Sequence, residues 1–157
     1  HRFLPAPLFV ETAAVAQSLL NERAIAETLS LARNVDIHLV GIGAIDSRLS
    51  GLYRTGYFNE QDMNAHRAAG AVGDLIGRFI GPEGQTLDID ANRCVIGLDL
   101  EALRQTSTVI GVAGGDVKAP AILAALKGQY LDVLITDAIT ATQVLDLHTD
   151  NQNIKYA

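Results

Sequence analysis

The last third of the 157-residue chain alternates apolar, strand-like runs with helical stretches, and this alternation constrains the fold more than any other feature. Gly114-Gly115 gives a tight turn after the first run, and Gly128 ends the helix that follows. Two strands joined through a helix normally pair in parallel by a right-handed crossover. The sequence therefore predicts an α/β fold with a mostly parallel sheet and flanking helices. The expected elements are a buried strand over 108–113, a helix over 117–127, a second buried strand over 131–136 and a helix to about residue 147.

The first hundred residues carry shorter elements. Apolar residues at helical spacing predict two short helices from Thr12 onward, and Asn21 can cap the second. Asn59 can cap a further helix that has acidic residues in its first turn. Residues 71–80 suit either a helix or a strand, and an extended strand is the preferred interpretation. The other expected ranges are a strand over 35–40 that stops at the following glycines, a surface loop over 46–56, the Asn59-capped helix to about residue 69, a turn at 81–84, an irregular segment to 93 and a helix over 100–105.

Composition excludes several classes of protein. Hydrophobic residues make up 48% of the chain and charged residues 19%, which is typical of a folded domain rather than a disordered tail. The net charge of -6 gives no electrostatic footprint for a nucleic-acid backbone. Apolar runs such as 109–113 fall far short of the ~20 residues that span a bilayer, so no membrane partner is expected. A single cysteine, Cys94, and four scattered histidines build neither a disulfide nor a metal site, and a reducing, cytoplasmic setting fits best.

The beginning of the chain suggests that it comes from a longer protein. It lacks an initiator methionine and opens on the apolar, turn-forming run His1-Arg2-Phe3-Leu4-Pro5. No basic region followed by an apolar stretch comes after it, so a secretory signal is not expected.

Lys118 is the first candidate binding residue. In parallel sheets, ligands bind beyond the carboxyl ends of the strands, where free amides at helix N-termini hold anions. Lys118 falls in the first turn of the helix expected over 117–127, where a cation is mildly unfavourable unless an anion lies nearby. A phosphate held jointly by the Lys118 ammonium and by the amides near Gly115 and Val117 would explain it. A solvated surface lysine explains it equally well.

Two aspartates and two glycines are further candidates. Asp137 follows a strand and can accept hydrogen bonds from a sugar hydroxyl, although helix capping is the simpler explanation. Asp74 lies in an apolar, glycine-rich segment and needs a partner there, either a ligand hydroxyl or an internal salt bridge with Lys118 or Arg78. Gly41 and Gly43 permit close approach of a ligand, but they complete no dinucleotide-binding motif.

The remaining reactive residues give no catalytic site. The segment around Lys118 lacks the spacing of a Walker A loop, so nucleotide hydrolysis is not supported. Sheet packing explains His38 better than catalysis, His66 is expected to face solvent, and Cys94 is expected to pack as a small hydrophobe. No nucleophile has a base partner nearby in the sequence.

Several motifs occur in one order along almost the whole chain, and together they resemble a known family. The chain is similar to the effector-binding domain of the SorC-type bacterial transcriptional regulators of sugar metabolism. The motifs that carry this resemblance are Leu4-Pro5-Ala6-Pro7-Leu8-Phe9, Val40-Gly41-Ile42-Gly43, Ser50-Gly51-Leu52-Tyr53-Arg54-Thr55-Gly56-Tyr57, Gly70-Ala71-Val72-Gly73-Asp74-Leu75-Ile76-Gly77-Arg78-Phe79, Val95-Ile96-Gly97-Leu98, Val112-Ala113-Gly114-Gly115 with Lys118, and Val133-Leu134-Ile135-Thr136-Asp137.

The resemblance implies both a fold and a function. The fold would be a Rossmann-like α/β domain related to sugar-phosphate isomerases and CoA transferases. Such a domain senses a phosphorylated sugar and controls an attached helix-turn-helix DNA-binding domain, usually within a homo-oligomer such as a dimer or tetramer. The resemblance places Lys118 and Asp74 in the effector pocket, Gly43 near its floor and Asp137 as a further candidate, while Gly115 belongs to the phosphate site argued above. It implies no catalytic residue, metal or cofactor.

Two portions of the family pattern are expected outside this chain. One is a strand–helix portion with a Gly-Gly-Thr type loop, which would precede His1. The other is the helix-turn-helix domain, through which operator DNA would be bound. Residues 1–157 are therefore expected to form the C-terminal part of the effector domain, apparently truncated at its N-terminus.

Three hypotheses follow for the function. The first is a sensor that binds a phosphorylated sugar without turnover and changes DNA affinity by linkage. The second is a sugar-phosphate isomerase-like enzyme on the same fold, with Asp74 as its only plausible base. The third is an assembly module without a ligand. The motif order favours the sensor.

Overall fold

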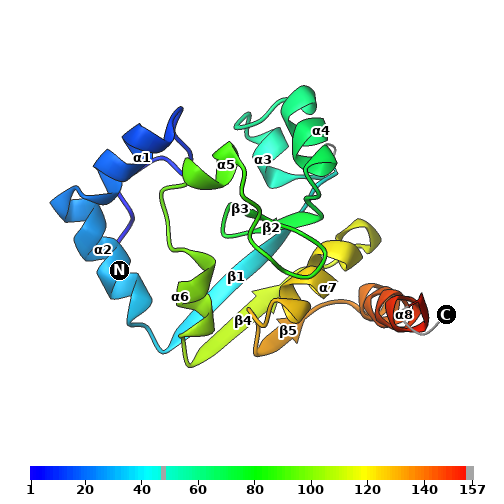
Figure 1. The fold of residues 1–157 in the computed structure, drawn as a ribbon. Helices are drawn as coiled ribbons and strands as arrows, with labels where there is room; N and C mark the ends of the chain where they lie inside the picture. The colour runs from blue at the N-terminus through cyan, green and yellow to red at the C-terminus, as the bar shows by residue number, and fades with distance from the viewer. Residues whose placement is uncertain (47–48, 155–157) are drawn as a thin grey trace.

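The computed structural model describes residues 1–46 and 49–154, and helices surround a five-stranded sheet in it (Figure 1). The elements in chain order are α1 (Ala13–Leu20), α2 (Arg23–Arg33), β1 (Ile37–Ala44), α3 (Gly51–Arg54), α4 (Glu60–Ala68), β2 (Gly73–Leu75), β3 (Arg78–Ile80), α5 (Asp90–Arg93), α6 (Leu100–Arg104), β4 (Thr108–Val112), the 3-10 turn η1 (Asp116–Lys118), α7 (Ala119–Lys127), β5 (Val133–Ile135) and α8 (Ala138–Ile154).

The sheet is mixed rather than mostly parallel. Its strand order is β3-β2-β1-β4-β5. β1 pairs with β4 in parallel and β4 with β5 in parallel, as the strand–helix–strand alternation predicts. On the other side of β1 the pairings with β2, and of β2 with β3, are antiparallel. The α/β class is confirmed, while the expectation of a mostly parallel sheet holds only for the half built by β1, β4 and β5.

The antiparallel half comes from a hairpin where one extended strand was expected. The two turn residues, Ile76 and Gly77, both have positive φ angles, 49° and 80°. Two-residue turns of this kind match the twist of paired strands and favour tight hairpins. The chain therefore reverses between β2 and β3 instead of running straight from 71 to 80. The sequence did not predict this turn, because isoleucine rarely adopts a positive φ.

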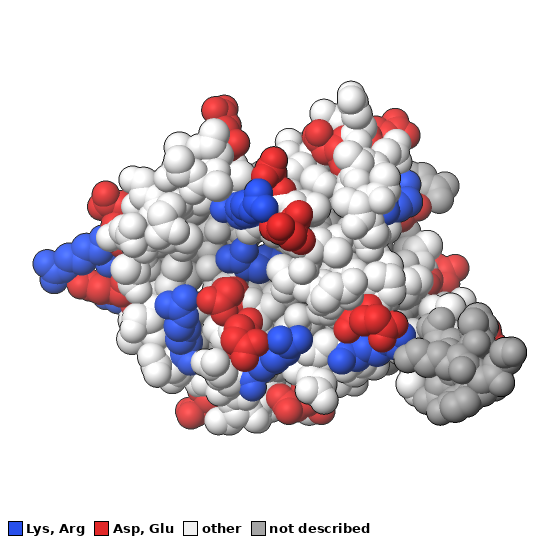
Figure 2. Space-filling model, viewed as in Figure 1, with Lys and Arg blue, Asp and Glu red and all other residues white. Residues whose placement is uncertain are grey.

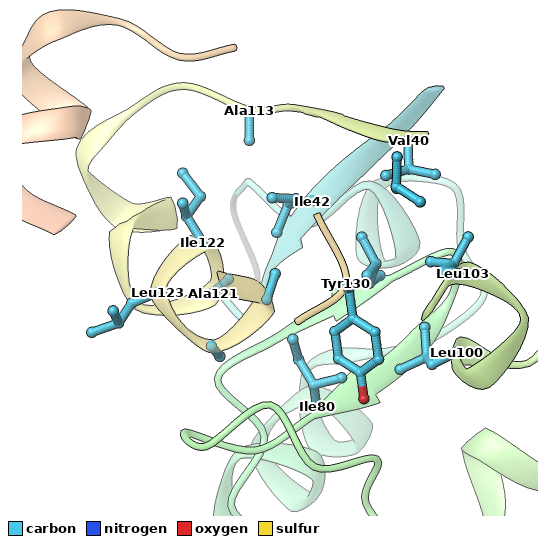
Figure 3. Close-up of a cluster of buried hydrophobic side chains, with 14 of the residues drawn as sticks. Val40, Ile42, Ile80, Leu100, Leu103, Ala113, Ala121, Ile122, Leu123 and Tyr130 are labelled. Atoms are coloured by element: carbon cyan, nitrogen blue, oxygen red, sulfur yellow. The ribbon is translucent and has the colours of Figure 1, made fainter. Parts of the chain in front are cut away.

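The main hydrophobic core lies between the sheet and α7. Val40 and Ile42 of β1 share this cluster with Ile122 of α7 (Figure 3). A side chain at Gly73 would overlap that of Ala121, so α7 packs directly on the backbone of β2. The buried Tyr130 closes the cluster, and its hydroxyl donates to the Gly84 carbonyl at 2.7 Å. This contact ties the turn at 81–84 to the core.

Several predicted boundaries move in the structure. β1 continues through Gly41 and Gly43, because its pairing with β4 and β2 outweighs the weak strand propensity of glycine. Asn21 ends α1, and Glu22 rather than Asn21 is the residue before α2. The expected surface loop at 46–56 contains α3, although residues 47–48 lie outside the described residues. The helix expected over 117–127 is divided into η1 and α7. α7 begins only at Ala119, because Pro120 favours the first turn of a helix.

Two local predictions are confirmed by hydrogen bonds. Asn59 caps α4 in a capping box, in which its side chain accepts from the Asp62 amide at 3.0 Å and Asp62 accepts from the Asn59 amide at 2.9 Å. The turn at 81–84 is closed by the Gly84 amide, which donates to the Gly81 carbonyl at 2.9 Å. Both contacts involve neighbours in the sequence, which is why local patterns were sufficient to predict them.

The second strand of the predicted pair is not buried. Val133 is 43% exposed and Ile135 53% exposed, and Leu39 on β1 is 70% exposed on the same side of the sheet. β5 lies at the edge of the sheet, with α7 covering the opposite face. Its apolar composition therefore predicted the strand correctly and its burial wrongly.

Within the described part of the chain, no helix is long and apolar enough to cross a membrane.

Candidate functional site

A cavity of about 760 Å³ opens beside the carboxyl-terminal half of β1. Glycines of β1 and the turn of the β2–β3 hairpin form one side of it, and η1 reaches it through Lys118. Apolar residues from the N-terminal segment, α2 and α6 complete the lining. The lining residues that matter below are Arg2, His38, Gly41, Gly43, Asp74, Gly77 and Lys118, and the apolar wall includes Leu4, Leu8, Leu29, Leu98 and Leu103.

Asp74 is held against the backbone of β1. It is the middle residue of β2 and faces Gly43 across the antiparallel pairing. A Cβ added to Gly43 would overlap the Asp74 carboxylate, so the missing side chain of Gly43 makes the room that the carboxylate occupies. The strand pairing therefore sets both residues at one wall of the cavity.

Burial raises the pKa of Asp74 to about 6. Loss of hydration disfavours the ionised carboxylate and is the largest cause. A backbone hydrogen bond from Gly77 and the positive charge of Lys118 both act in the opposite direction, because each stabilises the ionised form. The carboxyl group is thus able to change its protonation state near neutral pH.

Lys118 reaches the same cavity from the other half of the sheet. It ends η1, the turn that follows β4, and its own amide donates to the Gly115 carbonyl at 3.0 Å. The parallel pairing of β1 with β4 places this turn next to Gly43 and Asp74, which come from β1 and β2, two strands earlier in the chain. The cavity therefore holds one cation and one acid that the sequence analysis selected separately.

Gly115 and Asp137 lie outside the described lining of this cavity. The Gly115 amide donates to the Asp137 carboxylate at 3.1 Å and to the Thr140 hydroxyl at 2.8 Å. The Val117 amide donates to the Asp116 side chain at 2.8 Å. The two amides that were expected to be free for a phosphate are therefore already engaged with side chains.

Asp137 acts at the start of α8. Its carboxylate accepts from the Thr140 amide at 2.8 Å and from the Thr140 hydroxyl at 2.7 Å. These bonds, followed by the one from Gly115, lower the pKa of Asp137 to about 2. Asp137 thus caps α8, which is the simpler of the two roles considered for it from the sequence. Through its bond with Gly115 it also holds the loop that leads to Lys118.

Two residues of the lining had not been selected from the sequence. Arg2 brings a second cation, and no local pattern singled it out because only the folded chain brings the N-terminal segment to β1. His38 is half-buried in β1, as sheet packing predicts, and it also lines the cavity. Burial lowers the pKa of His38, and its Nε2 atom has no hydrogen-bond partner among the described residues.

The prediction for His66 was wrong. Its ring is half-buried and packs against Phe58 and Phe79, with centroid distances of 4.9 and 4.4 Å. Burial lowers its pKa, and the charge of Asp62 only partly offsets this effect. Cys94 is buried, as expected for a small hydrophobe, and the part of the chain that the structure describes contains no cluster of potential metal ligands.

Comparison with known proteins shows that this chain is similar to parts of transcriptional regulators. Residues 1–146 match the family described as "Putative sugar-binding domain". The transcriptional regulator LsrR of Klebsiella pneumoniae is 40% identical over 146 residues, which are 92% of this chain and 45% of that protein. LsrR of Escherichia coli K12 is 38% identical over 144 residues, again 45% of its length. The chain thus spans about half the length of these curated relatives.

Solved structures support the same assignment. A DeoR family transcriptional regulator from Listeria monocytogenes is 31% identical with a TM-score of 0.86, over 91% of this chain and 57% of that one. The full-length sorbitol operon regulator SorC from Klebsiella pneumoniae is 25% identical with a TM-score of 0.80, over 88% and 45% of the two chains. These relatives are regulators of transcription rather than enzymes. The chain belongs to the sugar-binding domain family of SorC- and DeoR-type transcriptional regulators.

Proposed function

We propose that this chain is the effector-binding part of a sugar-responsive transcriptional regulator, and that its cavity binds a phosphorylated sugar. The observation that carries the proposal is the meeting of Lys118, Asp74 and Gly43 at one cavity, from two halves of the sheet. Family membership supports a sugar ligand in general. The phosphate group is argued from the site itself.

Lys118 is the residue that we assign to the phosphate. An ammonium group binds phosphate as a point charge and needs no fixed donor geometry. The amides of Gly115 and Val117 are engaged elsewhere, so they serve to hold the loop and not the ligand. Asp137 supports the same loop from α8. Gly115 and Asp137 thus remain in the proposal as residues that position Lys118.

Asp74 and the glycines are assigned to the sugar. A carboxyl group at the cavity wall can bind a sugar hydroxyl, and Gly43 leaves room for that carboxyl group. Gly41 has nothing within 4 Å of the position of an added Cβ, which lets a ligand approach the backbone of β1. The apolar wall formed by Leu8, Leu98 and Leu103 suits the non-polar face of a sugar ring.

The wider proposal concerns the whole regulator. We assign residues 1–157 to the C-terminal part of the effector domain, on a Rossmann-like fold related to sugar-phosphate isomerases and CoA transferases. Operator DNA would be bound through a helix-turn-helix domain elsewhere in the polypeptide, in a cytoplasmic homo-oligomer. Effector binding would change DNA affinity because the ligand favours one of two conformations.

A thermal-shift screen tests the ligand class. Phosphorylated sugars should raise the melting temperature and their unphosphorylated counterparts should not, because only the former place a charge at Lys118. At one hundred times the dissociation constant, a ligand stabilises the native state by about 2.7 kcal/mol. Lys118→Ala should abolish the shift. Lys127→Ala is the matched control, since Lys127 lies at the far end of α7 and pairs with Glu83 at 2.8 Å.

The same screen separates the alternatives. An isomerase-like enzyme with Asp74 as base would convert the bound sugar phosphate, so a product assay on each sugar that shifts the melting temperature would detect turnover and contradict the sensor hypothesis. An assembly module without a ligand would show no shift with any phosphorylated sugar. A shift in melting temperature that survives in Lys118→Ala would mean that Lys118 does not bind the phosphate.

A further inference from the structure

A cation and a buried acid share the proposed phosphate site without forming a salt bridge. Neither Asp74 nor Lys118 takes part in an ion pair of the described residues, although both line the cavity. Gly43 leaves the carboxylate room against β1, and Gly77 supplies its backbone hydrogen bond. A ligand phosphate at Lys118 would therefore bring a second negative charge close to the carboxylate.

The neighbouring elements offer few other charges that could compensate. On β3, Arg78 donates to the carbonyls of Asn92 at 2.7 Å and Leu98 at 2.9 Å. The remaining ionisable groups on elements around Asp74 are His38 on β1, Asp116 on η1, Lys127 at the far end of α7, and Arg2 in the cavity lining. Of these groups and Lys118, Lys118 is the one whose charge lowers the pKa of the Asp74 carboxyl group.

We propose that the site binds its anion together with one proton, which is taken from solvent by the Asp74 carboxylate. The bound state would then hold a dianion between the Lys118 ammonium and the Asp74 carboxylic acid. The acid donates its O–H to an oxygen of the anion, and hydrogen bonds to a charged acceptor are about twice as strong as neutral ones. This inference rests on the proposed function and names the way in which the same site is regulated by pH.

The direction of the coupling follows from the charges. The pKa of Asp74 is already raised to about 6 by burial, so at pH 7 the empty site is mostly ionised. A dianion nearby raises the carboxyl pKa further, because like charges disfavour ionisation. Between the pKa values of the empty and the occupied site, binding takes up a proton. Affinity therefore falls as pH rises above about 6, towards a limit of about tenfold per pH unit.

Sulfate and glucose 6-sulfate are suitable probes, because neither titrates in this pH range and any proton taken up must go to the protein. Carbon NMR of the Asp74 carboxyl group gives its pKa with and without the probe, at ionic strength matched with chloride. The dissociation constant is measured in parallel from pH 5.5 to 8.5. We expect a higher Asp74 pKa in the presence of the probe and weaker binding at higher pH.

Variants identify the group that takes the proton. Asp74→Asn keeps the shape of the side chain and a hydrogen-bond donor, so its binding should be independent of pH. Asp146→Asn removes an exposed carboxylate of α8 and should behave like the parent chain. The NMR measurement on the parent chain decides the question even if Asp74→Asn fails to fold.

The other outcomes overturn either the proton coupling or the proposed function. Probe binding that is independent of pH in the parent chain, or pH dependence that survives in Asp74→Asn, overturns the coupling and leaves the anion site intact. If phosphorylated sugars bind and neither sulfate probe does, the Asp74 pKa is measured with the phosphorylated sugar instead, and a pKa that this sugar does not raise overturns the coupling. Absence of binding by all anions overturns the proposed function and the coupling with it.

Discussion

Gly43 has no side chain, and the Asp74 carboxylate occupies the space that a side chain there would fill. Gly43→Ala would put a Cβ 2.7 Å from the Asp74 Cγ, so the carboxylate would have to rotate away from the wall of the cavity. We expect a loss of about 1–3 kcal/mol in the free energy of unfolding, the usual cost of overpacking, together with weaker ligand binding. Urea denaturation and the thermal-shift screen measure the two effects.

Gly41→Ala is the control for this substitution. It lies two residues earlier on the same strand and lines the same cavity, but an added Cβ there meets nothing within 4 Å. Its stability should therefore stay within about 0.5 kcal/mol of the parent chain. Equal losses in both variants would mean that the strand tolerates no side chain in general and that contact with Asp74 is not the cause.

At the scale of single elements, the hairpin of β2 and β3 depends on its two-residue turn. Gly77 has a φ of 80°, which other residues adopt at a cost, and an added Cβ would come within 3.2 Å of Leu8. Gly77→Ala should lower the free energy of unfolding by on the order of 1 kcal/mol or more. Gly97→Ala is the matched change, because Gly97 has no positive φ and only an ordinary contact of 3.7 Å with Val95. Similar unfolding midpoints for the two variants would contradict this account.

Elements were predictable from the sequence wherever neighbours in the chain decide the structure. The capping box of α4 and the strand–helix–strand run after residue 108 follow from local spacing, and both are present. The reversal at Ile76-Gly77 was missed because an isoleucine with positive φ is held by its surroundings and not by its own preference. The half-buried ring of His66 was missed for a related reason, since Phe79 reaches it from another element.

The candidate site was predictable in part, for a reason that lies in the topology. Lys118 and Asp74 were selected separately, each because its charge was unfavourable in its local setting. That they share a cavity follows only from the pairing of β1 with β2 on one side and β4 on the other. Arg2 reaches the cavity from the other end of the chain, and no local rule identifies such a residue.

At the scale of the whole molecule, charge determines which partners this chain can hold by itself. The net charge is -6, and Figure 2 shows Lys and Arg side chains interspersed with Asp and Glu over the face in view. Affinity for DNA comes largely from clustered cations that displace counterions from the phosphates. We expect residues 1–157 to show no binding to duplex DNA at about 150 mM salt, even at about 100 µM protein, where non-specific DNA-binding proteins are already bound.

Fluorescence anisotropy with a labelled duplex, repeated at about 50 mM salt, measures this absence directly. Binding that weakens steeply as salt is added would reveal a cationic surface on this chain, and would contradict the assignment of operator DNA to another part of the regulator. Addition of a sugar phosphate should leave the lack of DNA binding unchanged, because a ligand anion at Lys118 adds negative charge to an already acidic chain. In the proposed regulator, the effector would therefore act on DNA affinity through conformation, by favouring one arrangement of the DNA-binding domains.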